Sequence, residues 1–200
     1  MYTWPAAYSN GLCLVSGIFL KTLLIVWWSR TGASAALAKA CADAAGKEFG
    51  LASDVKAKPV GAEQQRSDFQ VVRQRCDEVN AETLLGADAF VFICPENLGS
   101  MAGAMKEFFD QNYYLALEKL NGRSYACVVA AGSDGQGAVR QIERIALGWR
   151  LKKIADSVIV NTHAQSPEDI WAAKTLSPEQ LRPAQELGQL AAAGLKLGIY

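Results

Sequence analysis

The sequence predicts a doubly wound α/β fold, in which helices cover both faces of a parallel β-sheet. Short apolar runs, as expected for strands buried on both faces, alternate along the chain with amphipathic stretches at helical period. Polar and glycine-containing loops follow the apolar runs, and no internal repeat is present. With right-handed crossovers, this alternation places helices on both sides of one sheet.

The first strand is expected at Leu23–Trp28, where the apolar run is uninterrupted. A helix is expected from Ala33 to about Lys47, because small apolar residues recur there on one helical face. The next stretch is less regular. We interpret Asp54–Val60 as an outer strand and Gln64–Arg75 as a helix.

The alternation is clearer in the second half of the chain. Further strands are expected at Ala87–Cys94, Tyr125–Ala131 and, more weakly, Ala155–Val160. Apolar stripes at helical period follow these runs at residues 101–112, 139–149 and 181–195. The last helix begins at Ser177-Pro178-Glu179, where serine can cap the helix and proline suits its first position.

The length of 200 residues suits a single domain with a substantial core, and 50% of the residues are hydrophobic. Twenty basic residues balance 20 acidic ones, so no overall basic field attracts nucleic acid. We therefore expect a small ligand and no nucleic-acid partner.

The five cysteines are odd in number, widely separated and never spaced as C-x-x-C. They are Cys13, Cys41, Cys76, Cys94 and Cys127. This pattern fits neither a disulfide framework nor a zinc site, so no metal is expected. Cys94 and Cys127 lie within apolar runs, where small buried thiols are expected. Reduced thiols favour a cytoplasmic protein.

Residues 11–28 are almost wholly apolar and are long enough to suggest a membrane span or an export signal. Lys21 interrupts the stretch, no basic residue precedes it, and no cleavage-site pattern follows it. We therefore expect no membrane insertion. Residues 1–20 are interpreted as an N-terminal extension, and residues 21–200 as one domain.

Three loops follow the predicted strands at the edge where α/β sheets bind ligands. The first, Ser29–Ser34, leads into a helix N-terminus, where hydroxyls and free backbone N–H groups can bind a phosphate. Its serines and threonine could instead serve only as helix caps. The loop has neither a G-x-x-x-x-G-K nor a G-x-G-x-x-G pattern, which argues against ATP and Rossmann-type NAD binding.

The second loop, Pro95–Gly103, contains proline and glycine and can present backbone groups to a planar ligand. An ordinary polar turn is the alternative. The third loop, Gly132–Gly137, contains more glycine than a plain turn needs, so that a ring could rest against its backbone.

Two of these loops resemble a known family. Ser29–Ser34 matches the S/T-x-T-G-x-T/S phosphate loop of flavodoxins. Residues 95–110 are similar to the P-x-x-x-G-S/N-M-x-G-x-x-K/R-x-F-x-D segment of the flavodoxin-like NAD(P)H-dependent FMN reductases and quinone reductases. The resemblance covers about residues 21–160 and implies a five-stranded sheet of order 2-1-3-4-5 that binds FMN noncovalently.

The resemblance also implies which residues bind FMN. The phosphate would be held by Ser29, Arg30, Thr31, Gly32, Ala33 and Ser34. The isoalloxazine would be lined by Pro95, Glu96, Asn97, Leu98, Gly99 and Ser100, with Gly132, Ser133, Asp134 and Gly135 on the third side. For the Arg30 side chain, exposure to water is favoured over a phosphate contact, because backbone amides suffice.

The implied function is hydride transfer from NAD(P)H through FMN to a quinone, a flavin or a similar small acceptor. Because the flavin N5 carries the chemistry, no catalytic side chain is required. A flavodoxin-type electron carrier with protein partners and a non-catalytic binding protein remain open as alternatives. Flavodoxins are typically acidic, so the neutral charge favours the enzyme. Whether the chain forms a homodimer also stays open.

The second and third loops lack the aromatic residues that often enclose the flavin in flavodoxins. Their absence keeps the non-catalytic alternative open. Trp27, Trp28, Tyr113 or Tyr114 could supply the missing ring, although aromatic residues beside apolar segments more often belong to the core.

Overall fold

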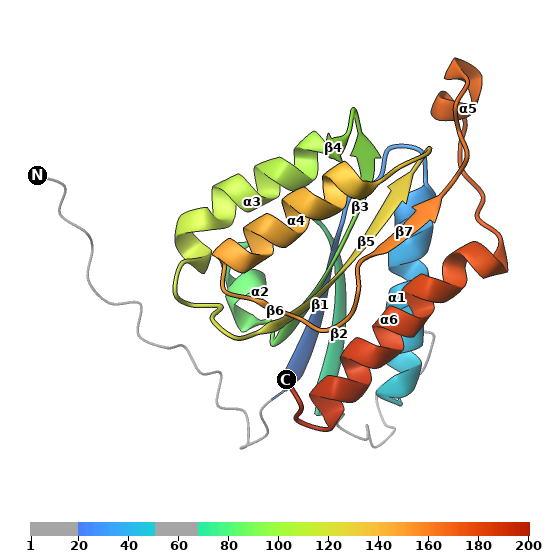
Figure 1. The fold of residues 1–200 in the computed structure, drawn as a ribbon. Helices are drawn as coiled ribbons and strands as arrows, with labels where there is room; N and C mark the ends of the chain where they lie inside the picture. Colours follow the sequence, from blue (N-terminus) through green and yellow to red (C-terminus); the bar gives the residue numbers. More distant parts are fainter. Residues whose placement is uncertain (1–19, 51–67) are drawn as a thin grey trace, which may run out of the picture.

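The computed structural model describes residues 20–50 and 68–200 of the chain. Its strands are β1 (Lys21–Trp27), β2 (Phe69–Arg75), β3 (Ala89–Asn97), β4 (Ser100–Met101), β5 (Ser124–Ala131), β6 (Lys152–Lys153) and β7 (Val158–Asn161). Its helices are α1 (Ala33–Glu48), α2 (Ala81–Gly86), α3 (Gly103–Ala116), α4 (Gln136–Gly148), α5 (Pro167–Trp171) and α6 (Pro178–Lys196). Figure 1 shows one sheet between two helical layers.

The order of the parallel sheet confirms the predicted 2-1-3-4-5 arrangement. β2, β1, β3 and β5 lie side by side in that order, and all of these pairings are parallel. The fifth position is divided, because β6 pairs with the beginning of β5 and β7 with its end. The short β4 lies outside this order and pairs antiparallel with the end of β3.

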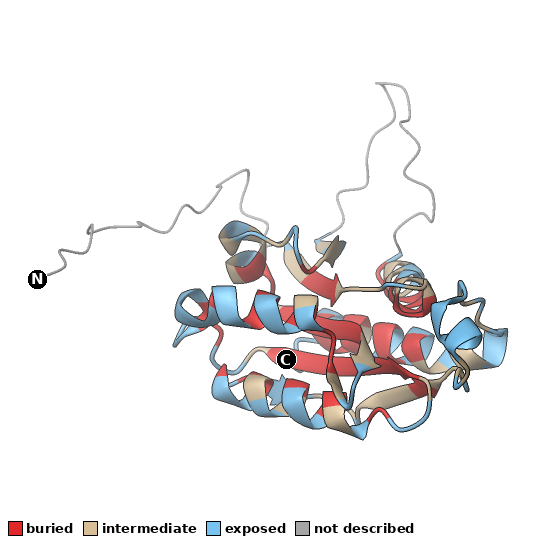
Figure 2. Cartoon of the chain, turned by 90° about the horizontal axis from the view of Figure 1, so that it is seen from above, coloured by how far each residue is buried: buried red, intermediate tan, exposed pale blue. Residues whose placement is uncertain are grey.

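Each face of the sheet has its own apolar core. One core joins the sheet to α1 and α6, and the other joins it to α2, α3 and α4. Figure 2 shows the sheet buried between these layers, with the outer faces of the helices exposed. Leu23 to Val26 of β1 have no exposed surface, as expected for a strand covered on both sides.

The predicted helix at Gln64–Arg75 is wrong for the residues that the structure describes. Phe69–Arg75 forms β2, which lies at the edge of the sheet among the described strands and pairs with β1. The polar residues of this segment resemble a helix surface, but an edge strand also tolerates them. Arg73 and Arg75 place their guanidinium groups 5.4 and 5.9 Å from the ring centre of Trp27. The strand interpreted at Asp54–Val60 lies outside the described residues.

Other boundaries also differ from the predictions. Met101 belongs to β4 and not to the helix that follows it, which begins at Gly103. The last predicted strand begins at Val158 and not at Ala155. The short helices α2 and α5 were not expected. Ser177, by contrast, caps α6 as predicted and forms a reciprocal capping box with Gln180.

The four cysteines in the described part of the chain are free and buried, which confirms the prediction for Cys94 and Cys127. Burial raises the pKa of Cys94 to about 12 and that of Cys41 to about 12. These thiols are therefore protonated near neutral pH and are poor nucleophiles. None of the helices in the described ranges has the length and apolar character needed to cross a membrane. Residues 1–19 of the expected extension, residues 1–20, lie outside those ranges.

The carboxylate of Glu143 on α4 connects that helix to the divided edge of the sheet. It accepts hydrogen bonds from Lys153 Nζ (2.8 Å) and Ser157 Oγ (2.7 Å). The hydrogen bond from Lys153, and then that from Ser157, lowers the pKa of Glu143. Because the folded state favours ionised Glu143, these hydrogen bonds stabilise the fold at pH values above the pKa of this residue in the unfolded chain. Their contribution is lost as the pH falls through the lower pKa of Glu143 in the folded state.

We therefore expect Glu143→Gln to lower the free energy of unfolding at pH 7 by less than about 1 kcal/mol, because the pair is partly exposed. The difference from the unsubstituted protein should shrink below about pH 4. Urea unfolding at several pH values measures it, with the exposed Glu78→Gln as control. A difference that grows as the pH falls would contradict the assignment.

Candidate functional site

A cavity of about 620 Å³ opens at the carboxyl edge of the parallel strands, at the top of the sheet in Figure 1. All the predicted site residues line it except Gly32, Ser100, Asp134 and Gly135. Residues that had not been predicted also line it, namely Ala130, Ala131, Thr162, Ala164, Ile170, Trp171 and Lys174. The three predicted loops therefore do meet at one cavity, and a fourth wall comes from the segment after β7.

The loop after β1 is a tight turn into α1. Gly32 has a left-handed backbone (φ 101°), a conformation that strongly favours glycine. Its N–H donates to Ser29 Oγ at 3.0 Å, which leaves the proton of the Ser29 hydroxyl available to a ligand. The loop thus places the unpaired first-turn N–H groups of α1 at the cavity.

Ser34, in the first turn of α1, carries the clearest ligand signal in the cavity wall. Its side chain is 1% exposed, and its hydroxyl has no hydrogen-bond partner within the described structure. An unpaired buried hydroxyl costs about 1–3 kcal/mol. A bound anion at this helix N-terminus would satisfy the hydroxyl and the neighbouring N–H groups together.

The second predicted loop is a small hairpin formed by the end of β3 and by β4, and not an irregular turn. Glu96 and Asn97 pair antiparallel with Met101 and Ser100. The tip, Leu98 and Gly99, has left-handed backbone at both positions (φ 53° and 70°), and the Leu98 side chain is fully exposed. The hairpin therefore holds an apolar side chain and a row of backbone groups beside the cavity.

Glu96 joins the second loop to the third. Its Oε2 accepts a hydrogen bond from the N–H of Gly135 at 2.7 Å. Its Oε1 is buried and has no partner among the residues that the structure places. The carboxylate therefore sets the position of two cavity walls relative to each other.

The glycines of the third loop serve backbone packing more than they provide space for a ligand. A Cβ on Gly137 would lie 1.8 Å from the carbonyl oxygen of Gly99, in the hairpin tip. A Cβ on Gly132 would lie 2.6 Å from the carbonyl oxygen of Ala164. Both contacts involve backbone atoms, so the adjacent walls meet only because these positions have no side chain.

The fourth wall is the segment from Thr162 to Lys174, which includes α5. Thr162 Oγ1 donates to the carbonyl of Ala131 at 3.1 Å, and the Lys174 N–H donates to the carbonyl of Thr31 at 2.7 Å. The segment is thus attached to the end of β5, next to the third loop, and to the first loop. Ser166-Pro167, where serine caps the helix, carries the same start signal as Ser177-Pro178 and could have revealed α5.

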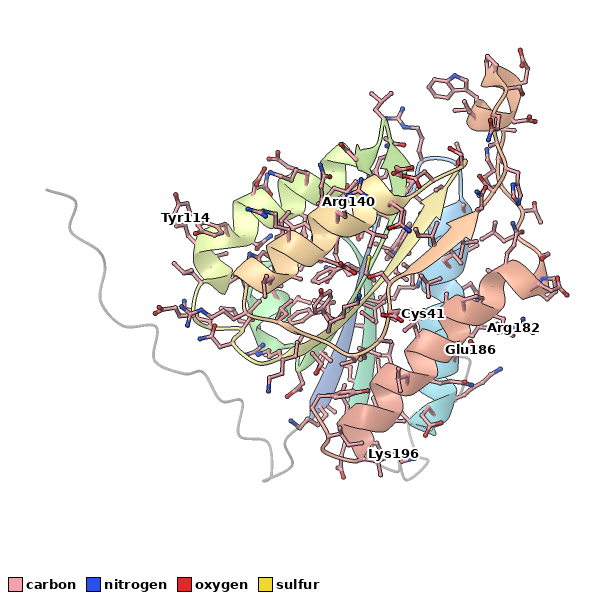
Figure 3. The ribbon with its side chains drawn as sticks, viewed as in Figure 1. Cys41, Tyr114, Arg140, Arg182, Glu186 and Lys196 are labelled. Carbon is pink, nitrogen blue, oxygen red and sulfur yellow. The ribbon has the colours of Figure 1, made fainter. Side chains whose placement is uncertain are left out.

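Trp171 of α5 supplies an aromatic ring that the predicted loops lack. The side chain is 69% exposed and lines the cavity beside Ile170. The predicted candidates Tyr113 and Tyr114 are exposed near the far end of α3 and do not line the cavity, as the position of Tyr114 in Figure 3 shows. Trp28 does not line the cavity, but its ring contacts Arg30, which does.

Arg30 lies beside two indole rings. Its Cζ is 5.7 Å from the ring centre of Trp28 and 5.9 Å from that of Trp171. The residue is exposed and lines the cavity, whereas Ser34 lies on the buried floor. Arg30 forms no ion pair with a described carboxylate.

Comparison with known proteins connects this site to one family. The family model described as NADPH-dependent FMN reductase matches residues 27–165. No curated protein sequence matches the chain. Solved structures with the same fold include an archaeal flavodoxin, at a TM-score of 0.60 and 16% identity over 88% of this chain and 99% of that one.

Two further structures are similar. A flavodoxin, WrbA-like protein from Agrobacterium tumefaciens has a TM-score of 0.61 and 13% identity, over 88% of this chain and 98% of that one. The Flv1 flavodiiron core from Synechocystis sp. PCC6803 has a TM-score of 0.64 and 16% identity, over 90% of this chain but only 37% of that one. At these identities the similarity shows a flavodoxin-like fold.

Proposed function

This chain belongs to the NADPH-dependent FMN reductase family, with FMN as its cofactor, and from that premise we propose that it oxidises NAD(P)H and reduces a small acceptor such as a quinone or a free flavin. The observation that carries the proposal is the cavity formed by the three predicted loops, with the unpaired Ser34 hydroxyl on its floor.

The floor of the cavity fits the phosphate of FMN. Ser34 Oγ, Ser29 Oγ and the first-turn N–H groups of α1 are donors without a competing acceptor at the cavity. The Lys174 ammonium adds positive charge to the same wall, while its Nζ donates to the carbonyls of Ile170 (3.3 Å) and Ala172 (2.7 Å), and to that of Asp169. Together these groups suit a dianion.

The remaining walls suit a planar ring. Pro95 to Gly99 on one side and Gly132 and Ser133 on another offer backbone edges, and the Glu96 carboxylate holds these two loops together through Gly135. Rigid walls of this kind reduce the ordering cost of binding. We assign the isoalloxazine to this part of the cavity.

When bound, FMN supplies the two-electron chemistry that links oxidation of NAD(P)H to reduction of the acceptor. Among the described residues of the cavity wall, only Arg30, Glu96 and Lys174 are ionisable, and Glu96 and Lys174 hold backbone groups in place. The role of the chain is then to bind, orient and shield the reactants, without a side chain that acts as general acid or base.

The proposed function is tested with purified protein saturated with FMN. We expect a flavin absorption spectrum and oxidation of NADPH or NADH that depends on added quinone or flavin, followed at 340 nm. If FMN binds but neither nucleotide is oxidised with any such acceptor, the protein is not a reductase and the electron-carrier alternative applies. If FMN does not bind, the assignment of the cavity fails as well.

Ser34→Ala tests the phosphate assignment. We expect the Kd for FMN to rise about 10-fold, the equivalent of about 1.4 kcal/mol, because a charge-assisted hydrogen bond is lost. The free energy of unfolding without ligand should stay equal or rise, because the substitution removes an unpaired buried hydroxyl. Fluorescence titration and urea unfolding measure the two quantities.

Riboflavin, which lacks the phosphate, provides the internal control for Ser34→Ala, and its Kd should not change. Ser133→Ala is the matched variant, because this serine also lines the cavity but is exposed. If Ser34→Ala weakened riboflavin and FMN equally, Ser34 would not contact the phosphate.

A further inference from the structure

Arg30 has surroundings that the binding of FMN does not explain. Of the side chains that suit the FMN phosphate, Ser34 is buried and Ser29 and Lys174 are half-buried, whereas Arg30 is exposed. Several other described cations form ion pairs, such as Arg75 with Asp77 (2.8 Å) and Lys106 with Asp110 (2.6 Å). Within the described structure, the Arg30 guanidinium lies beside two indole rings and forms no ion pair.

The two indoles restrict the guanidinium without neutralising it. Trp28 packs partly against the core below the sheet edge, and Trp171 comes from α5, far away in the sequence. An arginine held beside aromatic faces keeps its full charge and loses less conformational freedom when it binds an anion. Its N–H groups stay free to form paired hydrogen bonds with phosphate oxygens.

Hydrogen bonds in and around α5 hold Trp171 beside Arg30. Ser166 Oγ caps the helix by accepting the N–H of Asp169 at 3.1 Å. Lys174 Nζ binds carbonyls at the other end of the helix, and its own N–H binds the carbonyl of Thr31, next to Arg30. A single connected unit therefore links the position of Trp171 to the loop that carries Arg30.

We propose that Arg30, restrained by Trp28 and Trp171, recognises a phosphate group of the nicotinamide dinucleotide substrate at the edge of the cavity. The inference rests on the proposed function, since it assigns a residue to the substrate of that reaction. The dinucleotide has a pyrophosphate, and NADPH also has a 2′-phosphate. Either group offers the oxygens that a guanidinium binds.

The experiment measures binding and not turnover. NADP⁺ and NAD⁺ are titrated by calorimetry into FMN-saturated protein that carries Arg30→Gln, Trp171→Ala or no substitution. We expect Arg30→Gln to weaken NADP⁺ about 10-fold and to reduce the salt dependence of its affinity. Trp171→Ala should weaken it about threefold, because the arginine keeps its charge but loses one restraint. A larger loss for NADP⁺ than for NAD⁺ identifies the 2′-phosphate, and equal losses identify the pyrophosphate.

Arg140→Gln is the matched control, because Arg140 is an exposed arginine on α4 outside the cavity wall (Figure 3). It changes the net charge by the same amount and should leave both affinities unchanged. The Kd for FMN should stay within about twofold in Arg30→Gln. The inference is overturned if Arg30→Gln leaves NADP⁺ and NAD⁺ binding unchanged, or if it weakens FMN and not the nucleotides. Neither result affects the proposed function, which fails only if the unsubstituted protein does not oxidise the nucleotides.

Discussion

Gly188→Ala is expected to lower the free energy of unfolding by about 3 kcal/mol, near the upper end of the usual cost of overpacking. Gly188 lies in α6 where this helix packs on α1, and a Cβ there would lie 2.2 Å from the carbonyl oxygen of Cys41. The clash is with backbone atoms, so no side-chain rotation relieves it. The two helices would have to separate along the most extensive helix–helix contact in the described part of the chain.

Gly148→Ala is the matched control for this prediction. Gly148 is also helical, at the end of α4, and a Cβ there would meet no atom within 4 Å. Alanine normally stabilises a helix relative to glycine by up to about 1 kcal/mol. The two substitutions should therefore change stability in opposite directions in urea unfolding. Equal effects would mean that the contact between α1 and α6 is not as tight as the structure shows.

Gly137→Ala is expected to raise the Kd for FMN by at least about 10-fold, even where the protein stays folded. A Cβ on Gly137 would lie 1.8 Å from the carbonyl oxygen of Gly99 and 3.3 Å from Glu96 Oε1. The hairpin tip would have to move away from α4, and the Glu96 to Gly135 hydrogen bond (2.7 Å) would be disturbed. The two cavity walls would then be less preorganised for FMN, so the ordering cost of binding would rise.

The control for Gly137→Ala is Gly103→Ala, at the start of α3 directly after the same hairpin. A Cβ on Gly103 would meet nothing within 4 Å, so FMN affinity should not change. Thermal unfolding of both variants without FMN separates loss of binding from loss of folding. Gly137→Ala protein with unaltered FMN affinity would show that the second loop does not form a wall of the flavin site.

The three ligand loops could be located from the sequence because their position follows from the strands. An uninterrupted apolar run such as Leu23–Trp28 can only be a buried strand or a buried helix, and the loop after it must emerge at the sheet edge. The use of glycine in these loops was only partly predictable. Gly32 is required by its own backbone angle, whereas Gly132 and Gly137 are required by residues that are distant in the sequence.

At β2 the local sequence pattern led to a wrong prediction of a helix. The stretch after the first helix is irregular, and Gln64–Arg75 is interpreted there as a helix. Phe69–Arg75 is a strand because it pairs with β1, and Arg73 and Arg75 lie over the ring of Trp27. A seven-residue segment cannot reveal this contact, because the ring that it covers belongs to another strand.

The sequence by itself determined the alternation of strands and helices, the sheet order implied by family resemblance, and the loops that surround the cavity. These depend on apolar periodicity and on turn and capping residues, which act over a few positions. Only the tertiary structure decided that α5 lines the cavity, that Trp171 and Trp28 flank Arg30, and that Glu96 joins two loops. The contacts of Arg30 with Trp171 and of Glu96 with Gly135 join residues far apart along the chain, and the local sequence around each residue does not indicate its partner.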